Sequence, residues 1–292
     1  MSALLEHLGT GTTTVCRCWA VTRADGTVLG FTDHDTELSF EDISFRADSG
    51  LTAKALSQTT GLSVDNTEAM GALSDASIRE ADIEAGRFDG AEVRAWLVNW
   101  ADVTERMLQF KGSIGEIRRQ GGAFHAELRG LAEKLNEPMG RVFQRGCGAV
   151  LGDETCRFDL NADGYVTSQV ASAETEGQVF RFPGLLNFED RWFERGTLTL
   201  TSGAAVGLSG VIKHDRVIDG VRVVELWAPI RADVAEGDTL RMTAGCDKRA
   251  ETCRLKFNNY LNFQGFPDIP GEDWLISVPT RSGDNSGGSR TR

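Results

Sequence analysis

The chain reads Gly146-Cys147-Gly-Ala-Val-Leu-Gly-Asp-Glu-Thr155-Cys156-Arg157-Phe158 in one place and Gly245-Cys246-Asp-Lys-Arg-Ala-Glu-Thr252-Cys253-Arg254-Leu-Lys-Phe257 in another. Both stretches begin with Gly-Cys, end with Thr-Cys-Arg and have a phenylalanine soon after. Four thiolates that converge on one point are the ligand set of a structural zinc ion or of an iron–sulfur cluster. We therefore interpret the two stretches as halves of one metal-centred clamp, with Cys147, Cys156, Cys246 and Cys253 as its ligands.

The spacing within each pair favours a cluster over zinc. Eight residues separate the thiols of the first pair and six separate those of the second. Zinc ribbons usually take their ligands from tight knuckles with about two to four intervening residues. We therefore expect a [4Fe–4S] cluster and keep zinc as the alternative. The basic residues Arg157, Lys248, Arg249 and Arg254 are placed to offset its negative charge.

The bulk composition describes a folded, acidic protein. With 292 residues, 40% hydrophobic and 25% charged, the chain is long enough for a sizeable core and favours two domains over one. Its formal charge of −12 argues against a partner such as nucleic acid or an anionic membrane. The sequence predicts neither a transmembrane helix nor a signal peptide, so we expect the six cysteines to be reduced.

The N-terminal half alternates like β-structure. The Asp25-Gly26 turn predicts a hairpin between strands at 13–21 and 28–32. Helices are expected at 3–9, from Ser74 or Asp75 to Ala85, and at 131–143, where Pro138 would kink or break the helix. Further strands are predicted at 38–45, 92–100, 107–117 and 123–128.

A second β-rich region lies between the two cysteine pairs. Glycine and aspartate turns separate candidate strands at 179–182, 197–200, 211–214, 221–227 and 239–242. Because this region follows one pair and precedes the other, we interpret it as a small β-barrel insert, at about 166–244, whose ends lie close together. The predicted fold is mainly β (α+β). It comprises a β-rich N-terminal domain at 1–136, a cluster-binding domain at 137–280 and a flexible tail at 281–292.

Three other patterns receive structural interpretations. Cys16 and Cys18 are two apart in a strand, so both should face one side of a sheet and be buried. The run Asp159-Leu-Asn161-Ala-Asp163-Gly164 resembles the start of a calcium loop, but Val170 replaces the glutamate required at its end. We read it as an Asn/Asp-rich turn. The run Thr32-Asp33-His34-Asp35 is interpreted as an Asx-type turn, although it could also suggest acid–base chemistry.

With these residues in view, the chain resembles the tail hub family of siphophage-like prophages and gene transfer agents. The resemblance is carried by Gly30-Phe-Thr-Asp-His-Asp35, by the loop from Gly146-Cys147 to Cys156, and by the segment from Cys246 to Pro270 with Asn262-Phe-Gln-Gly-Phe-Pro267. The thiol spacing is also similar to that of the lambda-type tail tip protein, in which four cysteines bind a [4Fe–4S] cluster. That similarity again implies Cys147, Cys156, Cys246 and Cys253 as ligands.

The resemblance implies a structural, non-enzymatic protein of the virion tail that is assembled in the bacterial cytoplasm. It implies a homotrimer between the distal tail protein ring and a large tail tip or fibre (megatron-type) protein, without direct contact to nucleic acid. Two enzymes remain as alternatives: a metal-dependent enzyme, or a cell-wall-degrading tail component in which the four cysteines bind structural zinc. The second would need a Cys/His pair, for which Cys16 or Cys18 with His34 is the thin candidate.

Overall fold

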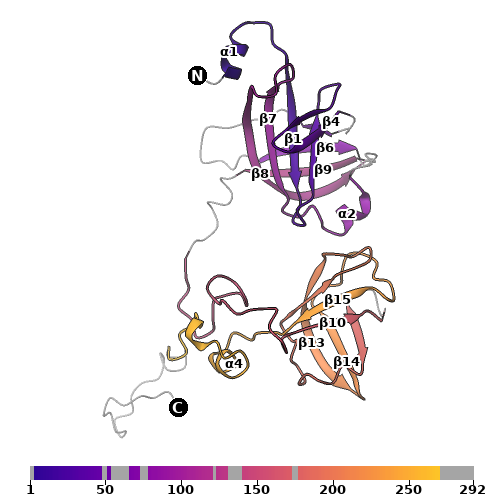
Figure 1. The fold of residues 1–292 in the computed structure, drawn as a ribbon, viewed down its shortest axis with the longest axis vertical. Coiled ribbons are helices and arrows are strands. Elements are labelled where there is room, and N and C mark those ends of the chain that lie inside the picture. Colours follow the sequence, from indigo (N-terminus) through magenta and orange to yellow (C-terminus); the bar gives the residue numbers. More distant parts are fainter. Residues whose placement is uncertain are drawn as a thin grey trace, which may run out of the picture. The chain divides into compact units, whose positions relative to one another are not determined.

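The structure is a computed structural model that describes residues 3–47, 51–53, 66–72, 78–120, 123–130, 140–172 and 177–269. The chain divides into two compact units, Met1–Pro138 and Met139–Arg292, shown in Figure 1. It is mostly β, with 37% strand and 9% helix, and has two sheets, one of them a half-barrel. The mainly β prediction is confirmed. None of the helices in the described part of the chain has the length and hydrophobicity that a membrane span requires.

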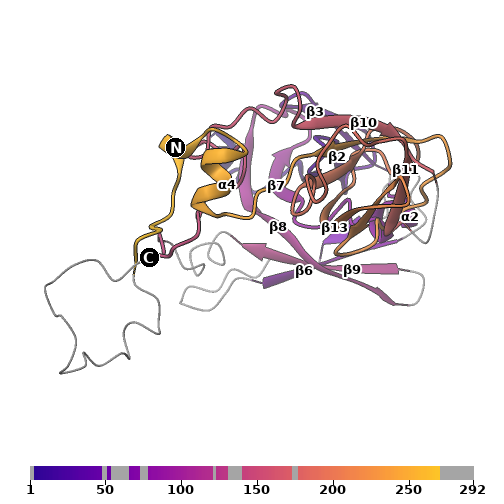
Figure 2. The same ribbon diagram turned by 90° about the horizontal axis from the view of Figure 1, so that it is seen from below.

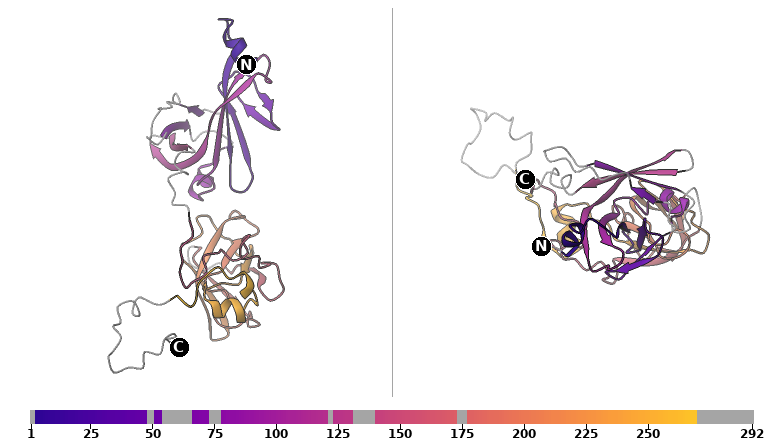
Figure 3. Two further views of the ribbon diagram at one scale, coloured as in Figure 1. Left: turned by 90° about the vertical axis from the view of Figure 1, so that its left-hand side faces the viewer. Right: turned by 90° about the horizontal axis from the view of Figure 1, so that it is seen from above.

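The first unit contains a nine-stranded sheet in the order β3-β4-β2-β1-β7-β8-β9-β6-β5. Its strands are β1 (Val15–Thr22), β2 (Val28–Thr32), β3 (Leu38–Phe40), β4 (Ile43–Arg46), β5 (Leu51–Ala53), β6 (Asn66–Ala72), β7 (Glu92–Asn99), β8 (Arg106–Gln120) and β9 (Ala123–Gly130). The β2–β4 pair is parallel. The β1–β2 pair of the predicted hairpin is antiparallel, as are the β7–β8 and β8–β9 pairs. The sheet is strongly twisted (Figure 3), and β8 runs on past β7 to pair with β9, which lies beside β6 (Figure 2).

Strand β1 is buried on both faces of this sheet, which explains its apolar composition. Trp19 and Val21 enter one core cluster, whereas Cys16, Cys18 and Ala20 enter the cluster on the opposite face. This is the period-2 alternation of a strand. The predicted burial of the two cysteines on a common face is therefore confirmed.

The local predictions for this unit hold in part. Helix α1 (Ala3–Leu8) and the Asp25-Gly26 hairpin are present, with Gly26 at φ 83°. Helix α2 (Glu80–Glu84) is shorter than predicted, and Ser74 and Asp75 lie outside the described residues. It ends as expected at Gly86, which has φ 73°.

The prediction of a helix over 131–143 is wrong for the residues of this range that the structure describes. Residues 140–143 have no helical structure, and residues 131–139 lie outside the described part of the chain. The flexible tail predicted at 281–292 also lies outside it.

The second unit holds a six-stranded sheet in the order β10-β15-β12-β13-β14-β11. Its strands are β10 (Val166–Val170), β11 (Val179–Pro183), β12 (Thr197–Leu200), β13 (Ser209–Ile218), β14 (Val221–Leu226) and β15 (Thr239–Thr243). The first and last strands pair, with Val166 opposite Thr243, so the two ends of the insert lie together as expected. Strand β10 is absent from the predicted strands because the aspartate-rich turn before it masked its short alternation.

One apolar core fills the insert. Alternate side chains of its strands are fully or nearly fully buried, namely Phe180, Phe182, Leu198, Leu200, Ile212, Val224, Leu226, Leu240 and Met242. The cysteine-bearing segments contain helix α4 (Ala250–Leu255) and the 3-10 turn η1 (Tyr260–Asn262). Both Figure 1 and Figure 2 show α4 to one side of the insert's strands. Helix α4 was not predicted, because its six residues are too few for a clear periodicity.

Candidate metal centre

All four predicted ligands line one small pocket of the second unit. Cys147, Cys156, Cys246 and Cys253 surround a cavity of about 10 Å³, whose walls also include Phe257, Asn259 and Phe263. The structure thus brings together thiols from two distant loops. Among the described residues, no three His, Cys, Asp or Glu side chains are spaced as ligands of a metal ion. Metal binding therefore stays a prediction.

The first cysteine loop is organised by Asp153. Its carboxylate accepts hydrogen bonds from the backbone N–H groups of Cys156 (2.6 Å), Thr155 (3.0 Å) and Val150 (2.8 Å). These bonds, led by the one from Cys156, lower the pKa of Asp153 to about 2. The turn ends at Arg157, whose φ of 56° is unusual for a residue with a side chain. Asp153 therefore fixes where Cys156 stands.

The second cysteine loop is joined directly to the first. The backbone N–H of Cys147 donates to the carbonyl of Lys248 (2.8 Å), and the Lys248 ammonium donates to the carbonyl of Ala149 (2.5 Å). Lys248 has φ 66°, and the chain then enters α4, which carries Cys253 on its buried side. Of the four basic residues expected to offset cluster charge, Lys248 and Arg249 line the pocket, whereas Arg157 and Arg254 are not among its lining residues.

The segment after α4 closes the pocket and donates hydrogen bonds to sulfur. The backbone N–H of Gln264 points at the Cys147 Sγ (3.4 Å), and the Asn259 amide points at the Cys156 Sγ (3.5 Å). Gly265 approaches so closely that a Cβ on it would lie 2.7 Å from the carbonyl oxygens of Arg145 and Gly146. Hydrogen bonds of this kind tune the sulfurs of iron–sulfur centres.

An aromatic cluster links the two loops to the insert. Phe158 and Phe257, the phenylalanines that follow the two Thr-Cys-Arg exits, meet edge-to-face with their ring centroids 4.9 Å apart. Tyr165 contacts both rings, and its hydroxyl donates to the carbonyl of Lys256 (2.6 Å). The shared pattern of the two stretches therefore corresponds to a real contact between them.

Comparison with known proteins identifies the family. Residues 1–159 match the family model described as baseplate hub protein, N-terminal attachment domain. The chain belongs to this family. Residues 191–273 of the hub protein match a second family, a phage conserved hypothetical protein termed BR0599. No curated protein matches the chain.

A solved structure extends the match over the whole hub protein. It is a chain of the virion of a native gene transfer agent (GTA) particle, 56% identical in sequence, with a TM-score of 0.89. The match covers 99% of both chains. The family resemblance read from the sequence is confirmed.

Burial and the nearby charges of the other cysteines raise the pKa of two thiols of this pocket, Cys246 and Cys253. Burial, followed by the charges of the other three cysteines, raises the pKa of Cys253 to about 11. Burial also raises the pKa of Cys246, although the Lys248 backbone and ammonium oppose that change. Metal ligands must be thiolates, so any metal that binds here must displace protons from the hub protein. In donor type and number, the residues present fit a cysteine-ligated centre.

The remaining candidate sites of the hub protein are structural. Cys16 and Cys18 lie in the core of the first unit, where the Thr32 hydroxyl contacts both sulfurs. The ring of His34 bonds to Thr36, and the structure shows no bond from His34 to either thiol among the described residues. The expected Asx-type turn is instead made by a threonine: the Thr32 hydroxyl oxygen accepts a hydrogen bond from the backbone N–H of His34. The Asx turn at Asp159 is confirmed by its bond from the Asn161 N–H (2.8 Å).

Sequence reasoning missed Lys256, which lies between the insert and the cysteine loops. Its ammonium donates to the carbonyls of Trp192 (2.6 Å) and Gly245 (2.9 Å). It also lies 4.3 Å from the centroid of the Trp192 ring. A lysine three positions after a cysteine carries no signal for this role, because its partners are backbone carbonyls far away in the sequence.

Proposed function

We propose that this chain is a structural tail hub of a phage-like or gene transfer agent particle, and that Cys147, Cys156, Cys246 and Cys253 hold a [4Fe–4S] cluster. The observation that carries the proposal is the convergence of these four thiols in one pocket. The chain's membership of the baseplate hub family supports the tail assignment. So does its 56% identity to a chain in a gene transfer agent virion.

The cluster would act as a structural cross-link rather than as a reaction centre. It would join two loops that are separated in sequence by the whole six-stranded insert. When bound, the group supplies iron–thiolate bonds, whose free energy contributes directly to folding. The chain's own residues orient the thiols: Asp153 fixes the first loop, and the N–H groups of Gln264 and Asn259 point at two of the sulfurs.

The hub would occupy the virion tail tip as a homotrimer that joins the distal tail protein ring to a large tip or fibre protein. It would be assembled in the bacterial cytoplasm, where reduced thiols are available for metal loading. The family description of residues 1–159 as an attachment domain is consistent with the first unit making one of these joints. We assign the protein no catalytic activity.

Zinc is the alternative occupant, and the small cavity favours it. About 10 Å³ is room for about one water molecule, so a cubane cluster would require the four thiols to move apart. Structural zinc in the same place would leave the hub role unchanged.

Anaerobic purification followed by iron, sulfide and zinc analysis separates these occupants. We expect a brown protein that absorbs near about 400 nm and contains iron and sulfide in equal amounts. A colourless protein with one equivalent of zinc would show that zinc, and not a cluster, occupies the site. A chain with neither metal would refute the metal centre. Cys253→Ser should lose the metal and intact tails, whereas the matched control Cys16→Ala, outside the pocket, should keep both.

A further inference from the structure

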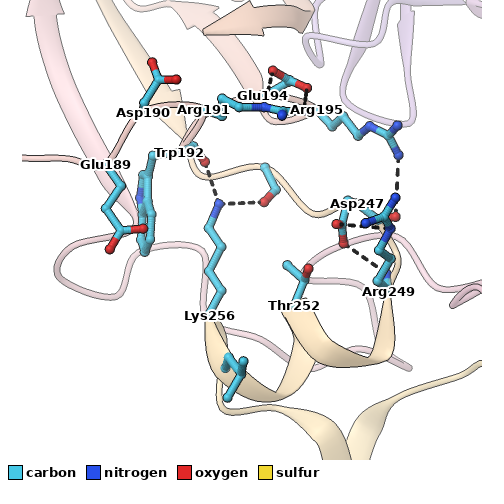
Figure 4. A pocket seen from close by; sticks show the side chains of 12 residues that line it. Glu189, Asp190, Arg191, Trp192, Glu194, Arg195, Asp247, Arg249, Thr252 and Lys256 are labelled. Atoms are coloured by element: carbon cyan, nitrogen blue, oxygen red, sulfur yellow. Dashed lines mark hydrogen bonds and ion pairs between the residues drawn. The ribbon is translucent and has the colours of Figure 1, made fainter. Parts of the chain in front are cut away.

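A second, larger pocket shares Arg249 with the cysteine pocket. It has a volume of about 610 Å³, within the usual range of ligand sites, and is formed by segments 189–195 and 245–256 of the second unit. Figure 4 shows the side chains around it. The hub proposal above gives this pocket no role.

One wall of the pocket is held in an unusual backbone conformation. Arg191 and Arg195 have φ of 63° and 66°, which residues with a side chain rarely adopt. The buried guanidinium of Arg222 holds the carbonyl oxygens of Phe188 (2.5 Å) and Glu189 (3.1 Å), at the start of this segment. The wall is therefore preorganised by contacts within the protein. Backbone strain of this kind concentrates at functional sites.

The opposite wall is fixed to the first. The N–H of Gly245 donates to the Trp192 carbonyl (3.1 Å), and the Lys256 ammonium bonds to the carbonyls of both residues. A Cβ on Gly245 would lie only 1.7 Å from the carbonyl oxygen of Glu194, so only glycine permits this approach. The width of the pocket is thus set by backbone contacts.

Two guanidinium groups at one end of the pocket have donors to spare. Arg195 makes one long bond, 3.5 Å, to the carbonyl of Asp247, and the Arg249 Nε lies 3.8 Å from the Asp247 carboxylate. The Arg249 side chain is 81% exposed. An arginine has five N–H donors in a planar fork that matches a carboxylate. Figure 4 shows the two guanidiniums close to Asp247, with Thr252 also on the α4 side of the pocket.

The rest of the lining mixes acceptors with one aromatic wall. Glu189, Asp190 and Asp247 line the pocket together with the half-buried Trp192, and the Asp190 carboxylate also accepts a hydrogen bond from the Val217 N–H (2.9 Å). The Trp192 indole N–H already donates to the carbonyl of Gly164 (3.1 Å), so the ring offers mainly carbon to a ligand. Hydroxyl groups both donate and accept, so a polyhydroxylated ligand satisfies such a mixed lining.

From these groups we propose that the pocket binds an acidic saccharide, a sugar unit that carries a carboxylate. The carboxylate lies between the guanidiniums of Arg195 and Arg249, and the ring hydroxyls bond to the acidic side chains. A peptide is the poorer match, because peptide pockets are lined mainly by apolar side chains and this one offers only Trp192 and Leu255.

Isothermal titration of the full-length protein with uronic-acid trisaccharides, of the galacturonate and glucuronate types, tests the proposal. Neutral maltotriose and sodium acetate serve as comparison ligands. We expect binding of at least one acidic trisaccharide, with about tenfold or greater weakening in Arg195→Ala/Arg249→Ala, because charge-assisted bonds are lost. Arg254→Ala, an exposed arginine of α4 that does not line the pocket, should bind like the wild type.

Each other outcome overturns the proposal. These are no binding of either acidic trisaccharide at millimolar concentration, equal binding of maltotriose or acetate, or unchanged binding by the double variant. A double variant that loses only tail assembly would assign the pocket to a protein neighbour instead. Metal content is measured on every variant, so a failed cysteine centre is distinguished from a failed saccharide site.

Discussion

At the scale of single residues, the insert is organised by a fully buried ion pair. The Arg222 guanidinium lies 2.7 Å from the Asp215 carboxylate, and neither side chain is exposed. Arg222 also donates to the carbonyl of Leu185 (3.1 Å), and Asp215 accepts from the N–H of Phe193 (2.8 Å). This pair therefore connects β13 and β14 to the segment that forms one wall of the second, larger pocket at 189–195 and 245–256, here termed the polar pocket.

Removing one member of this pair should be strongly destabilising. Arg222→Met leaves a buried carboxylate without its cation, and we expect it to cost about 3–5 kcal/mol in the free energy of unfolding of the second unit. Urea unfolding followed by hydrogen exchange of β14 amides measures the loss. Lys213→Ala breaks the neighbouring, partly exposed pair with Glu225 and should cost less than about 1 kcal/mol. Equal losses would contradict the assigned role of burial.

Glu194 should make the free energy of unfolding of the second unit depend on pH in the acidic range. Hydrogen bonds and charges from Arg191 and then Arg216 lower its pKa to about 2, below the value of an unfolded chain. A lowered folded pKa gives stability that is complete above the unfolded value, about 4.3, and is lost as the pH falls towards 2. The difference in unfolding free energy between the wild type and Glu194→Gln should therefore shrink across this window. A constant difference from pH 6 to about 2 would contradict this linkage.

At the scale of elements, two glycines beside pocket thiols should differ in how strongly the same substitution destabilises the unit. Gly245 precedes Cys246, and its Cβ would meet the Glu194 carbonyl at 1.7 Å; Gly148 follows Cys147, and its Cβ would meet nothing within 4 Å. We expect Gly245→Ala to separate the loop from the insert at a cost of at least about 1–3 kcal/mol, and Gly148→Ala to be nearly neutral. Thermal unfolding and reaction of the four thiols with a maleimide report the two effects.

How far these elements were predictable depends on where their determinants lie. The β1–β2 hairpin was predictable because Asp25-Gly26 specifies a turn within a few residues, and the burial of Cys16 and Cys18 because strand alternation is local. Strand β10 and helix α4 were not predicted. Each is short, and β10 is fixed by its pairing with β15, a contact that local pattern does not encode.

The cysteine pocket and the polar pocket also differ in how far the sequence predicts them. The convergence of four cysteines was predictable because the duplicated Gly-Cys and Thr-Cys-Arg pattern pointed to a shared pocket. The polar pocket carried no such signal, since its arginines and carboxylates are ordinary surface residues in the sequence. Their arrangement depends on backbone contacts made by Lys256 and Gly245 across the unit.

At the scale of the whole molecule, the two compact units should lose stability independently. The proposed centre belongs entirely to the second unit, whereas Cys16 belongs to a core cluster of the first. Cys253→Ser removes one ligand, so it should lower the unfolding temperature of the second unit through the lost metal–thiolate free energy. Cys16→Ala removes one buried sulfur, so it should lower that of the first unit slightly.

Calorimetry of the full-length protein checks this independence. We expect two transitions, one that moves with Cys253→Ser or with chelator treatment, and one that moves only with Cys16→Ala. The transition of the second unit should fall much further in temperature than that of the first unit. The centre fixes both cysteine loops, whereas the Cys16 side chain fills only part of a core. A single transition that shifts with both variants would show that the units unfold together. The metal centre would then stabilise the first unit as well, because loss of metal from the second unit would destabilise residues 1–138.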